Sequence, residues 1–284
     1  MQFKITLTPL QGETFVPFNY PYALSAVIYK KIAQADESYA AFLHQKGYAQ
    51  NDYSRHFKFF TFSNLQAKFI VVKEALKLQD NSVSFVLACH MPEFAENLVK
   101  GVFANQQLSI GDYTAQADFT VTQIEALPAI VANSSLETIH TVNLKLLSPI
   151  IIGRKNNRGN DDYLSPEDED FIALLKQNLC EKLAVAYGPE TAEQETQQKP
   201  FEIKTCAIAK LKSRLITIKA GKAAETKVRG FLGFELEMQA SGKVVEMALN
   251  AGLGGMNGMG FGCVEGEIQL KSQKIKICPR IVFK

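Results

Sequence analysis

Histidines and cations gather in one short polar segment of the sequence. His44 and His56 enclose a stretch that also holds Lys46 and Arg55, with Lys58 just beyond it. An imidazole has an unperturbed pKa of about 6.5, so it exchanges protons near neutral pH and suits general acid–base work in a site without a metal. A lone histidine in such a loop is more often a solvated surface residue than a catalyst. The segment is a candidate active site if the fold gathers these side chains.

The rest of the sequence contains no competing catalytic or metal-binding motif. The patterns G-x-S-x-G and H-E-x-x-H are absent, as are runs of spaced carboxylates. The five cysteines are far apart and never form a C-x-x-C pair, which argues against a disulfide framework and a zinc site alike. The acids at 167–170 are expected in the first turn of a helix, where the helix dipole favours negative charge, so we interpret them as structural. We predict neither a metal nor a cofactor.

Residues 252–262 hold six of the 18 glycines, namely Gly252, Gly254, Gly255, Gly258, Gly260 and Gly262. Neither the dinucleotide nor the P-loop spacing is met, and the stretch runs from a predicted helix into a predicted strand, whereas nucleotide loops run from strand into helix. Two interpretations stay open. The stretch is a flexible connection, or its backbone N–H groups cradle a phosphodiester.

Positive charge is concentrated between residues 204 and 229. Eight bases stand there against the single acid Glu225, while the net charge of the whole chain is only +2. The bases are Lys204, Lys210, Lys212, Arg214, Lys219, Lys222, Lys227 and Arg229. Alternate residues of a strand share a face, so 210, 212 and 214 are expected to form a row suited to phosphates. The alternative is an edge strand that lysines protect from pairing.

Hydrophobic spacing predicts two tandem units. Residues 3–7 alternate as a strand, an amphipathic helix starts at Pro21, and Asp36 is the expected N-cap of a second short helix that Gly47 ends. Strands at 57–62, 69–72 and 83–89, a helix from Pro92 and a strand at 108–127 complete a split βαβ pattern.

A similar order follows in the second half. We predict a strand at 139–152, a helix capped at 165–168, a polar linker at 194–200, strands at 201–208, 211–218 and 231–238, a helix at 244–250 and a strand at 264–270. The predicted fold is therefore α+β, with two tandem ferredoxin-like (βαββαβ, RRM-like) domains at 1–127 and 128–284 and a C-terminal glycine-rich loop.

Composition supports a globular chain with a large core. The 284 residues are 46% hydrophobic and 21% charged, with a mean hydropathy of -0.05. No apolar stretch reaches the roughly 18 residues that span a bilayer, and no secretory leader pattern is present at the start. We predict a cytoplasmic protein without a membrane partner.

Four motifs of this sequence resemble the CRISPR repeat-processing endoribonucleases (the Cas6 family) of the RAMP superfamily. They are Pro17–Tyr20 leading into Leu24–Tyr29, Phe42–Tyr48, Lys58–Ser63, and the glycine stretch that ends in Met259–Gly262. The resemblance spans most of the chain and implies two ferredoxin-like domains and metal-independent cleavage of repeat RNA. Carried over by position, it implies Tyr29, His44 and Lys58 as catalytic residues.

The resemblance sets a geometric condition. In one straight helix over 21–46, Tyr29 and His44 would lie about 22 Å apart at a rise of about 1.5 Å per residue, so one site requires the turn predicted at Asp36. The stretch from His44 to Lys58 is longer here than the family's pattern implies. This longer stretch contains His56, which is a second candidate for proton transfer.

The resemblance implies cleavage of the precursor transcript into guide crRNAs, with a 2′,3′-cyclic phosphate and a 5′-OH as products. The implied partners are the CRISPR repeat RNA, held by the 204–229 segment and the glycine stretch, and other CRISPR effector subunits; a monomer and a homodimer both stay open. Two alternatives remain. One is a non-catalytic RNA-binding subunit of a crRNA effector complex, and the other, which depends only on the glycines, is a nucleotide-dependent metabolic enzyme.

Overall fold

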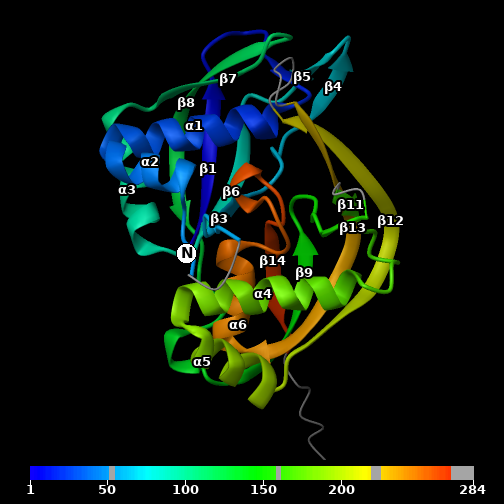
Figure 1. Cartoon of the computed structure of the whole chain (residues 1–284). Coiled ribbons are helices and arrows are strands. Elements are labelled where there is room, and N and C mark those ends of the chain that lie inside the picture. Colours follow the sequence, from blue (N-terminus) through cyan, green and yellow to red (C-terminus); the bar gives the residue numbers. More distant parts are fainter. Residues whose placement is uncertain (51–54, 158–160, 219–224, 270–284) are drawn as a thin grey trace, which may run out of the picture.

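The computed structural model describes residues 1–50, 55–157, 161–218 and 225–269. Helices α1–α3 lie at one end of the molecule and α4–α6 at the other, with the long β12–β13 ribbon along one side (Figure 1). Within the described ranges, no helix is long and apolar enough to cross a membrane.

The first half builds a five-stranded antiparallel sheet in the order β3-β6-β1-β8-β7. Its strands are β1 (Gln2–Pro9), β3 (Phe60–Phe62), β6 (Val83–Cys89), β7 (Gln107–Gly111) and β8 (Gln116–Ala126). The helices of this half are α1 (Tyr20–Ala35), α2 (Glu37–Gln45) and α3 (Pro92–Ala104). Apolar residues of these helices and of the sheet form one buried core. A separate three-stranded sheet contains β2 (Phe15–Pro17), β5 (Ala75–Leu78) and β4 (Phe69–Val72).

The second half builds a four-stranded antiparallel sheet in the order β12-β13-β9-β14. Its strands are β9 (Ile139–Leu146), β12 (Glu202–Ile218), β13 (Thr226–Ser241) and β14 (Val264–Ile268). Its helices are α4 (Phe171–Tyr187), the short α5 (Pro189–Glu193) and α6 (Gly242–Ala251). A small hairpin joins β10 (Gly153–Lys155) to β11 (Asp161–Tyr163). A second buried core lies between this sheet and its helices.

Both sheets share one strand order. In the first half β6 lies between β1 and β3, and β1 lies between β6 and β8; in the second half β13 and β9 take the same two central places. This is the arrangement of a split βαβ unit. The α+β class is therefore confirmed. The segment between β8 and β9 contains the predicted boundary at 127/128, which stays a prediction.

Several predicted elements differ from the observed ones. The strand predicted over 139–152 ends at Leu146, just before the Ser148–Pro149 break, because proline cannot donate to a ladder. Residues 108–127 form a hairpin rather than one strand, and the two strands predicted at 201–208 and 211–218 are one bulged strand, β12. Most of the supposed linker, Gln194–Gln198, is one π-helical turn.

Candidate active site

The turn predicted at Asp36 is confirmed and brings the first two candidate residues together. Asp36 ends α1 and begins α2 with an extended backbone, and its carboxylate accepts a hydrogen bond of 2.9 Å from the Tyr39 N–H. Because α2 folds back along α1, the rings of Tyr29 and His44 meet edge to face, with centroids 5.4 Å apart. The condition that one site requires is therefore satisfied.

A short antiparallel bridge returns the chain to the end of α2. Tyr48 and Phe57 exchange two backbone hydrogen bonds of 2.8 Å, which close the long stretch between His44 and Lys58 as a loop. The Lys58 Nζ then donates to the His44 carbonyl oxygen at 3.3 Å. Gly47, at φ +70°, permits this approach, since a Cβ there would lie 2.7 Å from the Phe57 carbonyl. The extra length of the stretch therefore does not keep Lys58 from His44.

The environments of the three side chains suit different tasks. Burial raises the pKa of Tyr29 to about 12, so its phenol stays neutral and can donate a hydrogen bond. Burial also lowers the pKa of Lys58 from its ordinary value. His44 is exposed, so a substrate can reach its ring from solvent. Together they offer a proton carrier, a hydrogen-bond donor and a cation.

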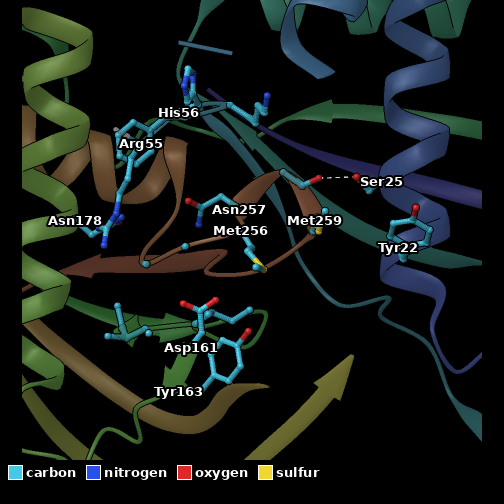
Figure 2. Close-up of a pocket in the computed structure, with 18 of the residues that line it drawn as sticks. Tyr22, Ser25, Arg55, His56, Asp161, Tyr163, Asn178, Met256, Asn257 and Met259 are labelled. Carbon is cyan, nitrogen blue, oxygen red and sulfur yellow. Dashed lines mark hydrogen bonds between the residues drawn. The ribbon is translucent and has the colours of Figure 1, made fainter. Parts of the chain in front are cut away.

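These residues line a pocket of about 680 Å³ between the two halves of the chain (Figure 2). The first half contributes residues of α1, His44 and the segment 55–58, which includes Arg55 and His56. The second half contributes 151–153, two residues of β11, two of α4 and the segment 254–259. The volume lies in the range of ordinary small-molecule sites.

The glycine stretch forms the joint between the halves. Gly252, Gly260 and Gly262 are buried with positive φ, and a Cβ on Gly260 would lie 2.3 Å from the Phe62 ring of β3. Across the same joint, Ser25 of α1 donates a hydrogen bond of 2.6 Å to the Gly258 carbonyl. Close packing and backbone conformation therefore account for these glycines. Of the six glycines in the stretch, only Gly254, Gly255 and Gly258 line the pocket.

Lys182, a buried lysine that the sequence analysis did not select, stabilises the glycine stretch through hydrogen bonds. Lys182 of α4 donates to the carbonyls of Gly252 at 2.6 Å and Gly254 at 3.1 Å, and to Asn257 Oδ1 at 2.8 Å. The Asn257 amide in turn donates to two further carbonyls of the loop. Burial lowers the pKa of Lys182 to about 7.

Replacing Lys182 with methionine is expected to change how stability depends on pH. Between pH 7 and about 10 the unfolded lysine holds a proton that the folded one has released, so raising the pH stabilises the folded wild type through this group. We expect the unfolding free energy of the wild type relative to K182M to rise by about 2 kcal/mol from pH 7 to pH 9. Urea unfolding at both values measures it. Lys176→Met, on the same helix, controls for the loss of one lysine, and parallel curves for wild type and K182M would contradict the prediction.

The structure does not gather the described bases of the 204–229 segment on one surface. Lys204 is paired with Glu237 across the sheet at 2.7 Å. Lys227 pairs with Thr217 and Arg229 with Leu215 across the two strands, and paired residues share a face of the sheet. Arg214 alternates with Leu215 along β12, so it lies on the opposite face. Lys219 and Lys222 lie outside the described residues. None of the described bases of the 204–229 segment lines the pocket.

Arg214 joins the two halves, and the predicted row is therefore wrong in its geometry. Its guanidinium donates to the Phe18 carbonyl at 2.9 Å and Asn64 Oδ1 at 3.1 Å, and lies 4.9 Å from the centre of the Tyr20 ring. Lys210 and Lys212 are exposed, but a bulge between Ile208 and Lys212 interrupts the alternation on which the row depended.

Other pocket residues were missed because single side chains carry little signal. Besides Tyr22, Ser25 and the β11 residues Asp161 and Tyr163, these include Asn178 of α4. One signal was available in the helical pattern. Asn178 and Lys182 interrupt the apolar face that Leu175, Leu179 and Leu183 form. Polar residues at core positions of an otherwise apolar helix face mark buried polar contacts.

Comparisons with known proteins agree across both halves. The family model for the N-terminal part of CRISPR-associated protein Cas6 matches residues 15–125, and that for the C-terminal part matches 132–266. The chain is 28% identical over 264 residues to "CRISPR-associated endoribonuclease Cas6 1" of Methanocaldococcus jannaschii, covering 93% of this chain and 91% of that protein. It is 26% identical over 292 residues to "CRISPR-associated endoribonuclease Cas6" of Pyrococcus furiosus, covering 100% and 96%. A solved "CRISPR associated protein Cas6" is similar with a TM-score of 0.67 and 25% identity, covering 94% of this chain and 99% of that one.

Proposed function

The chain belongs to the Cas6 family of CRISPR-associated proteins, and from that premise we propose that it is an endoribonuclease that cuts CRISPR repeat RNA into guide crRNAs. The observation that carries the proposal is the meeting of Tyr29, His44 and Lys58 at one pocket between the halves. We further propose that the domain boundary lies at 127/128 and that the protein works in the cytoplasm.

The proposed reaction uses the RNA's own nucleophile. The ribose 2′-oxygen next to the cut attacks the phosphorus in line, the bond from phosphorus to the 5′-oxygen breaks, and a 2′,3′-cyclic phosphate remains. The proton of the 2′-OH leaves and the 5′-oxygen gains one; His44 carries out one of these transfers as general base or acid. Lys58 offsets the charge that grows on the phosphoryl oxygens, and Tyr29 positions the phosphate through its neutral phenol.

RNA binding draws on charge and on shape, since the deep major groove of an RNA helix cannot be read by side chains. We propose that exposed bases of the β12–β13 ribbon hold the backbone, Lys227 and Arg229 from one face and Lys210 and Lys212 from elsewhere on the ribbon, and that Gly254, Gly255 and Gly258 let it approach the pocket wall. Arg214 is left out, because its guanidinium already binds the first half of the chain.

Incubation with a repeat RNA from the same genome, in excess chelator, tests the proposed function. We expect one cut per repeat at an unchanged rate after the chelator is added, with a 2′,3′-cyclic phosphate on the upstream product and a 5′-OH on the downstream one. End-group analysis by mass spectrometry distinguishes these ends from hydrolysis products. Tight binding without any cut, with or without divalent ions, would refute the enzyme and favour a non-catalytic RNA-binding subunit of a crRNA effector complex.

A further inference from the structure

The pocket extends well beyond the three residues of the proposed reaction. Figure 2 shows Tyr22 and Ser25 on α1 at one side of the pocket. At the other side lie Asn178 on α4 and Arg55 next to this helix. Leu174, one turn before Asn178, also lines the pocket. If the cleaved phosphate lies at the Tyr29–His44 side, the α4 side faces a neighbouring part of the same RNA. The polar side chains on and next to α4 indicate which chemical group of the RNA they bind.

The side-chain oxygen of Asn178 is buried and has no hydrogen-bond partner among the described residues. The residue is 5% exposed, and its Oδ1 makes no hydrogen bond to any part of the chain that the structure describes. One helical turn further on, the Lys182 Nζ lies within hydrogen-bond distance of three oxygen atoms, so the lack of a partner at Asn178 Oδ1 is local. A buried acceptor without a donor is costly and rare in folded proteins. Because Asn178 lines the pocket, a ligand bound there can provide the missing donor once the amide turns toward it.

Arg55 adds a planar cation to the same side, held by an ion pair with Glu181. Its Nη1 donates to Glu181 Oε2 at 2.9 Å, and Glu181 Oε1 accepts a further hydrogen bond of 2.9 Å from Gln177. Glu181 lies three residues after Asn178, on the same face of α4, so the guanidinium is held close to the unpaired amide. The planar faces of arginine guanidinium groups stack on nucleobases in complexes with single-stranded RNA.

We propose that Asn178, with Arg55 beside it, binds the nucleobase of one unpaired nucleotide next to the cleaved phosphate. The inference rests on the proposed function and adds a specificity-determining residue to it. An amide has both a donor and an acceptor, and its terminal torsion is broad, so a turn about χ2 brings either atom to a base edge. A phosphate oxygen would accept from Nδ2 but offers no donor to Oδ1, whereas a base edge with both a donor and an acceptor satisfies both atoms of the amide.

A double-mutant cycle between protein and RNA tests this contact. The protein variants are Asn178→Leu and, as a second replacement with a different shape, Asn178→Ala. The RNAs are the intact repeat and repeats in which one base at a time is removed, with ribose and phosphate kept, at the two positions on each side of the cut. Cleavage in chelator gives KM and kcat, and 2′-deoxy versions of the same RNAs give Kd without turnover. Asn97→Ala, a buried amide on α3 that is absent from the pocket wall, is the matched control.

With the intact repeat, both Asn178 variants are expected to raise KM and Kd about tenfold, which corresponds to loss of one base-edge contact, while kcat changes little. With the RNA that lacks the contacted base, wild type and variants are expected to bind equally. Thermal unfolding should leave Asn178→Leu at least as stable as the wild type, because the change removes an unsatisfied acceptor.

Equal losses on intact RNA and on every abasic RNA would overturn the inference, since the amide would then act through the protein alone or through the ribose. No loss on the intact repeat would overturn it as well. Failure of the proposed function is a separate result: the wild type would not cut the intact repeat, and the Kd cycle would still decide whether Asn178 contacts a base.

Discussion

His44→Ala is expected to slow cleavage of the repeat by about 10²- to 10⁴-fold, the range that general acid–base groups contribute, while Kd for uncleavable RNA stays within about twofold. The ring lies edge to face against Tyr29 and is exposed at the end of α2, so its loss removes a proton carrier without opening a cavity in the core. Single-turnover kinetics with saturating protein isolate the chemical step from binding and product release.

Two further histidines make the test specific. His140 lies in β9 with Nε2 3.0 Å from the Ser135 carbonyl oxygen, outside the pocket, so His140→Ala controls for the loss of an imidazole. His56 lines the pocket and is the second candidate for proton transfer, so His56→Ala measures its share. A His44→Ala protein that cuts at the wild-type rate would remove the assignment of His44. If only His56→Ala is slow, the proton carrier is His56.

A repeat with a 2′-deoxyribose at the nucleotide before the cut is expected to remain intact, which is the largest effect that the proposed mechanism predicts. Without the 2′-oxygen there is no internal nucleophile, whereas an enzyme that directs water to the phosphorus would still cut. Binding should change little, because one hydroxyl contributes a small part of an interface governed by phosphate contacts. Gel electrophoresis of labelled RNA after long incubation detects slow residual cleavage. We expect any residual rate to be at least about 10⁴-fold below the rate for the unmodified repeat, because the reacting group is lost.

The matched control moves the same deoxy substitution to the next nucleotide along the strand. That RNA should be cut at a rate close to that of the unmodified repeat, because its hydroxyl does not face the reacting phosphorus. Cleavage of the first RNA, or failure to cut both, would contradict the proposed chemistry. In the second case the deoxyribose would act through RNA shape rather than through the nucleophile.

Local signals in the sequence were sufficient for much of the fold. Asp36 is a helix cap that works within three residues, and the apolar spacing of α1 and α3 follows from the helical repeat, so both could be predicted without knowing what they contact. The strand order could be expected because split βαβ units recur. The bulge of β12 and the hairpin at 107–126 could not, because strand pairing depends on distant partners.

The candidate site shows the same division. Residue types identified the segment from His44 to Lys58 as chemistry-bearing, and resemblance to a family selected Tyr29, His44 and Lys58 as catalytic. Tertiary contacts alone decided that Arg214 joins the halves, that Gly260 packs on Phe62, and that Lys182 supports the glycine stretch. Helix caps and hydrophobic periodicity depend on a few neighbouring residues, so a short segment of sequence is enough to predict them. The pocket depends on which surfaces of two separate sheets meet, and that is settled only when both cores close and each buried polar group finds a partner or, as at Asn178, is left without one.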